Sequence, residues 1–216
     1  MNKVCRIVES KNINRRKYIE LEKQAHLLGT LRKEIWQRFG SINGVGTNHR
    51  TIRSDWVKIR DFKPLAAKAW KETLRDTLDD IKLYEEAAKE KVRKDIRKSK
   101  KSDCEKKELY KKLKSNVWVS NSYLCRKMRK YKKHGKTSIK NQIIVENGVY
   151  KQFQGKDGNT WLKIPSLQRG KMLCIPLSSK IQIKGCLRII LKEGTVYIHH
   201  TIKQRNLNHA EILLLV

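Results

Sequence analysis

Apolar residues recur at intervals of three and four along two long stretches of the chain, the spacing that gathers them on one side of a helix. The first stretch runs from about Asn14 to Phe39, and the second runs from Pro64, a residue suited to a first helical turn, to about Val92. Shorter stretches of the same kind predict helices at Cys104–Leu113 and Ser122–Lys133. Three tryptophans lie on or beside the apolar faces and are expected in the core: Trp36, Trp56 and Trp70.

After residue 140 the pattern changes to short β-prone runs separated by glycine turns. The runs predict strands at 142–145, 149–153, 160–164, 173–177, 182–191 and 195–203. Asn147-Gly148 and Glu193-Gly194 have the composition of hairpin turns. A further β-prone run, KVCRIV at residues 3–8, stands alone before the helices, and a lone strand needs a partner. We therefore expect an α+β fold in which residues 3–8 complete an antiparallel sheet or barrel.

Residues 40–54, GSINGVGTNHRTIRS, interrupt the helical part and predict a loop, because three glycines lie within it. Part of this loop consists of side chains that can donate hydrogen bonds to base edges or phosphates. These are Asn48, His49, Arg50 and Arg53. Glycine-flanked loops also occur for geometric reasons alone, so a purely structural role stays open.

The charge of the chain points to a polyanionic partner. Lys and Arg number 51 against 21 Asp and Glu, which gives a formal net charge of +30. A field of this size attracts phosphate backbones. No apolar stretch approaches the ~20 residues that span a bilayer, and MNKVCRIVES lacks the apolar region of a signal peptide. We therefore expect a cytoplasmic protein without a membrane partner.

The basic residues gather where acids are missing. No Asp or Glu occurs between Glu108 and Glu146, and the centre of this stretch reads YLCRKMRKYKKHGKTSIK. Basic side chains neutralise phosphates and a tyrosine can stack on an exposed base, so this segment predicts a nucleic-acid site. Its residues are Tyr123, Arg126, Lys127, Arg129, Lys130, Lys132 and Lys133. A solvated basic helix is the alternative, and it explains the mixed-charge segment 89–114 as well as a ligand does.

Residue patterns that support catalysis or metal binding are weak. Asp76, Asp79 and Asp80 are close in sequence, but their basic neighbours favour a solvated helical face. His199 and His200 are adjacent in a predicted strand and so point to opposite faces. The five cysteines show no C-x-x-C spacing, which favours free thiols that pack as small apolar residues over a zinc site. We expect no catalytic centre, no metal and no cofactor.

Several segments together resemble one family. They are LRKEIWQRFGSINGVG, IRSDWVK, AWKETLRDTLDDIKLYEEAAKEKVR, KIPSLQRG, IPL at 175–177 and IKGCLRIIL at 183–191. With these motifs the chain resembles the compact TnpB-like RNA-guided DNA nucleases, which include transposon-encoded TnpB proteins and small type V CRISPR effectors. The resemblance spans nearly the whole chain.

The resemblance implies a helical recognition lobe inserted into an antiparallel β wedge barrel. Residues 1–11 would form the first wedge strand, 12–138 the lobe, 139–205 the wedge barrel and 206–216 the start of a RuvC-like strand. In the family this strand has the form Gly-Ile-Asp-x-Gly and opens the nuclease domain. Here HAEILLLV stands in its place, so we expect a RuvC-less, truncated chain that does not cleave nucleic acid.

The resemblance also implies partners. In such systems the protein holds a guide RNA and reads a short motif in double-stranded DNA, while base pairing reads the rest. The 126–133 cluster would contact RNA or heteroduplex phosphates, and the 46–53 loop would contact DNA near the motif, in a prokaryotic cytoplasm beside the nucleoid. Three alternatives stay open: a general basic RNA-binding protein, a non-functional remnant, and one half of a split nuclease whose RuvC half is a separate chain.

Overall fold

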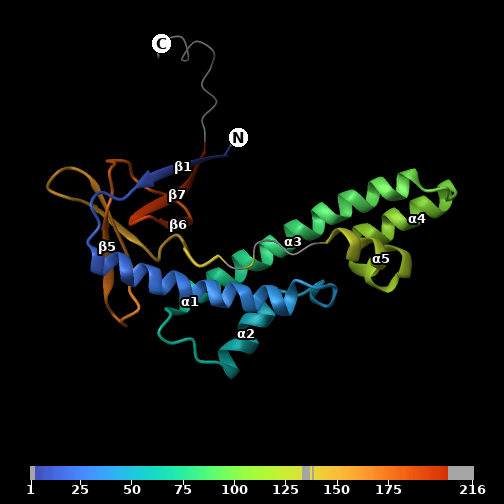
Figure 1. Ribbon diagram of the computed structural model, residues 1–216, viewed down its shortest axis with the longest axis horizontal. Helices are drawn as coiled ribbons and strands as arrows, with labels where there is room; N and C mark the ends of the chain where they lie inside the picture. The colour runs from blue at the N-terminus through green and yellow to red at the C-terminus, as the bar shows by residue number, and fades with distance from the viewer. Residues whose placement is uncertain (1–2, 133–136, 138, 204–216) are drawn as a thin grey trace, which may run out of the picture. The chain divides into compact units, whose positions relative to one another are not determined.

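The computed structural model describes residues 3–132, 137 and 139–203. In this part of the chain it shows an α+β fold of five α-helices and two antiparallel sheets (Figure 1). The described residues fall into two compact units, one within residues 1–28, 62–72 and 140–216 and the other within 29–61 and 73–139. Residues 12–28 thus group with the sheets, whereas the resemblance places them in the helical lobe; the domain assignment itself stays a prediction.

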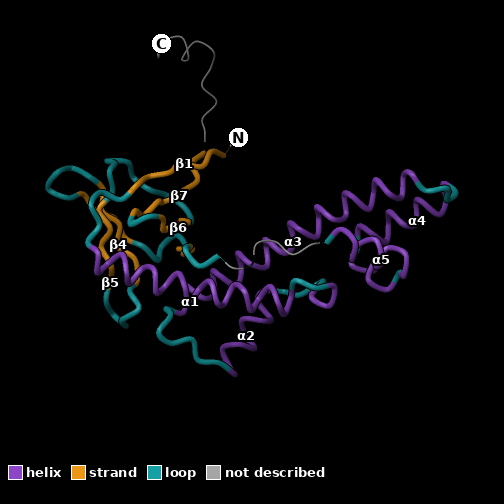
Figure 2. The backbone as a smooth tube through the Cα atoms, in the orientation of Figure 1, coloured by secondary structure: helices purple, strands orange, loops and turns teal. Residues whose placement is uncertain are grey.

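The first unit contains both sheets, drawn in orange in Figure 2. The four-stranded sheet has the order β1 (Lys3–Glu9), β7 (Thr195–Lys203), β6 (Leu187–Lys192) and β2 (Gln142–Val145). The three-stranded sheet has the order β3 (Lys151–Gln154), β4 (Thr160–Pro165) and β5 (Met172–Pro176). A single bridge between Ser10 and Leu177 joins them at one corner, and the described strands do not close into a barrel.

The lone strand at the start of the chain pairs as the sequence predicts. β1 runs antiparallel to β7 over its whole length, with Val8 opposite Ile198. The turn between β6 and β7 is formed by Glu193 and Gly194, both with positive φ, which matches the right-handed twist of the strands. One continuous apolar core lies between the sheets and the first half of α1 (Arg15–Phe39), from which Leu21, Ala25 and Leu28 enter it.

Two details of the β region differ from the prediction. Asn147-Gly148 forms a turn, but the strands on either side of it, β2 and β3, belong to different sheets. β6 begins at Leu187 and not at residue 182. The reason lies at Ile183. Its N–H donates to the side-chain amide oxygen of Gln152, and its carbonyl accepts from the amide nitrogen of the same side chain. The Gln152 side chain thus satisfies the backbone groups that a neighbouring strand would otherwise pair with.

The second unit is helical. It holds the end of α1, then α2 (His49–Ile59), most of α3 (Ala67–Lys98), α4 (Asp103–Lys114) and α5 (Ser122–Tyr131), with short 3₁₀ turns η1 (Ile42–Gly44) and η2 (Asn116–Ser120). α4 and α5 pack beside the end of α3 (Figure 1) around Val92, Ile96 and Trp118. The three tryptophans expected in the core, Trp36, Trp56 and Trp70, are all buried.

Two helix boundaries in the sequence interpretation were wrong. The predicted loop 40–54 ends at Asn48, because α2 begins at His49 and buries Ile52 and Trp56. Pro64 does not open α3, which starts at Ala67; residues 63–65 form a turn in which the Leu65 N–H donates to the Phe62 carbonyl.

Candidate nucleic-acid interface

α5 lies in a small helical bundle that fixes which of its sides faces out. Leu124 and Met128 are fully buried against α3, α4 and η2. The helix begins at a defined point because the side chain of Asn121 accepts a hydrogen bond from the Leu124 N–H at 3.0 Å. With this register set, the positions that are not in the core separate into an exposed side and a side that meets α3.

The exposed side carries three cations in one stripe. Arg126, Arg129 and Lys130 are spaced i, i+3 and i+4, and all three are exposed. α5 contains no acidic residue, and no carboxylate of the described residues lies within ion-pair distance of these three side chains. A hollow of about 300 Å³ adjoins Arg129 and is floored by residues 40–43. We call Arg126, Arg129 and Lys130 the α5 stripe.

The other side of α5 is neutralised by α3. The Lys127 ammonium lies 2.8 Å from the Asp95 carboxylate, and the Tyr131 hydroxyl donates to the same oxygen at 3.0 Å. The hydrogen bond from Lys127 lowers the pKa of Asp95, and the hydrogen bond to Asp95 raises the pKa of Lys127. The predicted cluster therefore is not free of acidic neighbours, because an acid distant in sequence is close in space.

Lys132 is also turned inward. Its side chain is 4% exposed; its ammonium lies 3.8 Å from Glu85 and donates to the Ser41 carbonyl at 3.0 Å. Burial lowers its pKa. Lys132 thus fixes the end of α5, and Lys133, the last predicted member of the cluster, lies outside the described residues.

The ring of Tyr123 faces two ammonium groups. Lys101 lies 5.6 Å and Lys127 lies 5.8 Å from its centroid, within the range of a cation–π contact. A base that stacked on Tyr123 would therefore have to displace a lysine, and that lysine would then lie beside the phosphate backbone.

The residues predicted from the 46–53 loop lie at the start of α2. Asn48 is the N-cap, and its side chain accepts from the Arg50 N–H at 2.9 Å, so this residue has a structural role. Arg50 and Arg53 are exposed and one turn apart, and His49 is half-buried. The predicted site thus consists of a helix start with two arginines and not of an open loop.

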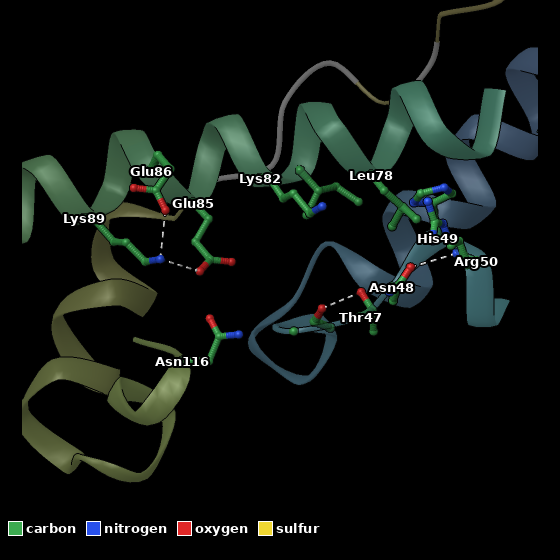
Figure 3. A pocket seen from close by; sticks show the side chains of 13 residues that line it. Thr47, Asn48, His49, Arg50, Leu78, Lys82, Glu85, Glu86, Lys89 and Asn116 are labelled. Carbon is green, nitrogen blue, oxygen red and sulfur yellow. Dashed lines mark hydrogen bonds and ion pairs between the residues drawn. The ribbon is translucent and has the colours of Figure 1, made fainter. Parts of the chain in front are cut away.

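A cavity of about 680 Å³ lies between this helix start and the middle of α3 (Figure 3). Its polar lining consists of residues 47–50, Lys82, Glu85, Glu86, Lys89 and Asn116. The volume falls in the range of small-molecule sites. Donors and acceptors both face it, which suits a polar ligand of about the size of a nucleotide.

One wall of this cavity is an ionic cluster around the buried Lys89, which the sequence interpretation missed. The Lys89 ammonium lies 3.0 Å from Glu85 and 2.9 Å from Glu86, as the dashed lines in Figure 3 show. Burial would lower the pKa of Lys89, but the hydrogen bonds to Glu86 and Glu85 raise it overall. Lys89 belongs to the segment interpreted as solvated or ligand-binding. The i, i+4 spacing of Glu85 and Lys89, next to the apolar Ile81 and Ala88, was the available signal.

The three aspartates of α3 are not a solvated face, contrary to the prediction. The guanidinium of Arg32, a buried residue of α1, contacts Asp76 and lies 2.8 Å from Asp80. Only Asp79 is exposed. The basic neighbours in the sequence were misleading because the cation that pairs with Asp76 and Asp80 is Arg32, which comes from another helix.

Two other expectations concern histidine and cysteine. His200 is buried and His199 is not, as opposite faces of a strand require, and burial together with Arg6 lowers the pKa of His200. No disulfide links the five cysteines, but Cys5, Cys104 and Cys186 are exposed, so the expectation that they pack as buried apolar residues was wrong. Within the described ranges no group of three His, Cys, Asp or Glu side chains could hold a metal ion.

Comparisons with known proteins leave the resemblance open. No protein-family model matches the chain, and no curated protein matches it either. None of the helices in the part of the chain that the structure describes combines the length and the apolar composition that a bilayer span requires. The relation to TnpB-like nucleases therefore stays a hypothesis.

Proposed function

We propose that this chain binds RNA and that the α5 stripe contacts the phosphate backbone. The observation that carries the proposal is the pairing state of the cations of α5. Lys127 and Lys132 have acidic partners on α3, whereas Arg126, Arg129 and Lys130 share one exposed stripe without a carboxylate from the described residues. Like charges on one stripe repel each other, and a phosphate backbone removes that cost.

The resemblance supports a more specific version of this proposal. The chain would be the nucleic-acid-binding portion of an RNA-guided DNA-targeting protein: α5 would hold the guide RNA, and Arg50 and Arg53 at the start of α2 would contact double-stranded DNA near a short motif. The two sheets would be the parts of an open wedge barrel, an idea supported by the bridge between Ser10 and Leu177. The proposal contains no catalytic step.

A charge-neutralisation experiment tests the binding site. The variant R126Q/R129Q/K130Q removes three charges from α5, and K107Q/K111Q/K114Q removes three exposed charges from α4, a helix that also carries Asp103, Glu105 and Glu108. Binding to a labelled RNA hairpin would be measured by fluorescence anisotropy over a series of salt concentrations.

The two variants differ in expected outcome. Loss of three phosphate contacts should reduce the slope of log affinity against log salt by about 2 to 3, because each contact contributes about 0.7 to 0.9. We expect this reduction for the α5 variant and a smaller one for the α4 variant. Equal reductions would mean that the charge acts as a diffuse cloud and that the α5 stripe is not a site.

A further inference from the structure

The outward face of the β3–β4 hairpin carries an aromatic pair that the core does not use. Phe153 and Trp161 are cross-strand partners, with ring centroids 5.9 Å apart and an interplanar angle of 26°. Phe153 is 41% exposed. The other four tryptophans of the chain are buried, whereas Trp161 is half-buried. A large aromatic surface at this position is therefore not explained by packing.

Lysines surround this aromatic pair. The Lys163 ammonium lies 4.7 Å from the centroid of Phe153, and the Lys17 ammonium lies 5.9 Å from that of Trp161 while it donates to the Cys174 carbonyl. Lys151 is directly opposite Lys163 across the two strands. Like charges placed opposite each other destabilise a sheet.

The acids nearby do not offset these charges. Asp157 in the β3–β4 turn lies 3.4 Å from Lys11 and accepts hydrogen bonds from Asn159. Among the residues that the structure describes, no carboxylate lies within ion-pair distance of Lys17, Lys151 or Lys163. The face therefore combines an exposed phenylalanine and a half-buried indole with unneutralised cations. As at Tyr123, a base that stacks on Phe153 would displace a lysine, here Lys163, which would then lie beside the phosphate backbone.

The position of Trp161 is set by a close backbone contact. A Cβ atom on Gly155 would lie 2.4 Å from the indole Nε1 of Trp161, so only glycine lets the ring lie against the turn. The indole is thus held against the hairpin before any ligand binds, which lowers the ordering cost of stacking.

We propose that Phe153 and Trp161, with Lys17, Lys151 and Lys163, form a stacking surface for unpaired nucleotides of a single strand. Aromatic rings stack on bases of any sequence, and neighbouring cations follow the phosphates. Paired bases expose no free face to such rings, so this surface distinguishes single strands from duplexes. It is separate from the α5 stripe, and it does not depend on the α5 stripe being a binding site.

The test compares single-stranded and duplex probes on the full chain. Labelled oligouridine, oligodeoxythymidine and a blunt-ended RNA duplex of two strands, which has no unpaired nucleotide, would be titrated by fluorescence anisotropy against the unsubstituted chain and the variant F153L/W161L. Leucine keeps an apolar side chain at both positions but offers no ring. Loss of stacking should weaken single-strand binding by about 5- to 150-fold for each base that stacks, and binding to the blunt-ended duplex should stay unchanged. The relative effect on oligouridine and oligodeoxythymidine tells whether the surface prefers RNA or DNA.

Two further variants separate stacking from folding. F153Y/W161F keeps both rings and should keep single-strand affinity. G155A keeps both rings but displaces the indole, so it should lose single-strand affinity while circular dichroism stays that of the unsubstituted chain. Unchanged oligouridine affinity in F153L/W161L would overturn the proposal. So would a polyglutamate peptide that binds this face as tightly as oligouridine, because the surface would then select negative charge and not bases.

Discussion

Replacing Arg32 with leucine removes the cation that two carboxylates of α3 share. The Arg32 side chain is 3% exposed, while Asp76 and Asp80 are more accessible to water. Breaking a buried ion pair by removal of one partner costs about 3 to 5 kcal/mol, and losing an exposed pair costs about 0 to 1 kcal/mol. Because water can partly rehydrate the aspartates, we expect R32L to reduce the free energy of unfolding of the helical unit by about 3 kcal/mol.

The matched control is R93L on α3, the helix that carries Asp76 and Asp80. Arg93 is paired with Glu90 at the surface, so its loss should cost no more than about 1 kcal/mol. Urea unfolding followed by far-ultraviolet circular dichroism would give both values, since the helices dominate that signal. Adding D76N and D80N to R32L should recover part of the loss, because the two carboxylates no longer carry the charges that Arg32 neutralised. Equal losses in R32L and R93L would show that Arg32 behaves as a surface cation and that our account of α3 is wrong.

Four other predictions follow from the charges. RNA affinity should fall by roughly 10³- to 10⁵-fold between 50 and 200 mM salt if six to ten phosphates are contacted; a flat filter-binding series would contradict the polyanion argument. The pKa of Asp95 is lower in the fold than in the unfolded chain, so its ionised form stabilises the fold at neutral pH. This contribution should start to decline as the pH falls to about 3.8, the ordinary pKa, and should be lost once the pH passes the lower pKa that Asp95 has in the fold. In K127M the free energy of unfolding, measured by urea denaturation at a series of decreasing pH values, should fall less steeply toward acid pH than in the unsubstituted chain. S102A should destabilise α4 by about 1 kcal/mol. Hydrogen bonds from the Ser102 backbone, Lys101 and the Ser102 hydroxyl hold the pKa of Glu105 at about 2; S102A removes the last of these and should raise that pKa, which carboxyl titration by NMR measures. Incubation of the chain with DNA or RNA and Mg²⁺ or Mn²⁺ should give no cleavage through Asp76 and Asp80, because a guanidinium occupies the position that a metal would need; cleavage that is lost in D76N/D80N would disprove this.

Local periodicity predicted the elements of this fold well. The 25-residue helix α1 has an apolar position on nearly every turn, and β1 had no partner other than a strand far along the chain. α2 escaped prediction because only Ile52 and Trp56 of its 11 residues are buried, too few to give a period. The N-cap residue Asn48 was the one local signal for its start.

The site was less predictable than the fold, because charge balance is decided in three dimensions. Arg129 and Lys127 look alike in sequence, yet one is exposed and the other meets Asp95 on a different helix. Arg32 and Asp76 show the same effect, because the residues around either one in the sequence give no sign that the other lies beside it in the fold. The surface at Phe153 and Trp161 was overlooked because a strand with period two does not indicate which face will stay uncovered.

The pairing of β1 with β7 has a consequence for how the chain is made. β1 leaves the ribosome before the five helices, and its partner, β7, leaves only after they have been synthesised. The helical unit can therefore assemble on the nascent chain while β1 has no neighbouring strand along either edge, and pairings between such distant segments form slowly. Val4 and Ile7 stay exposed even in the finished sheet, so until β7 has been made β1 presents both apolar side chains and unpaired backbone groups to which a chaperone can bind.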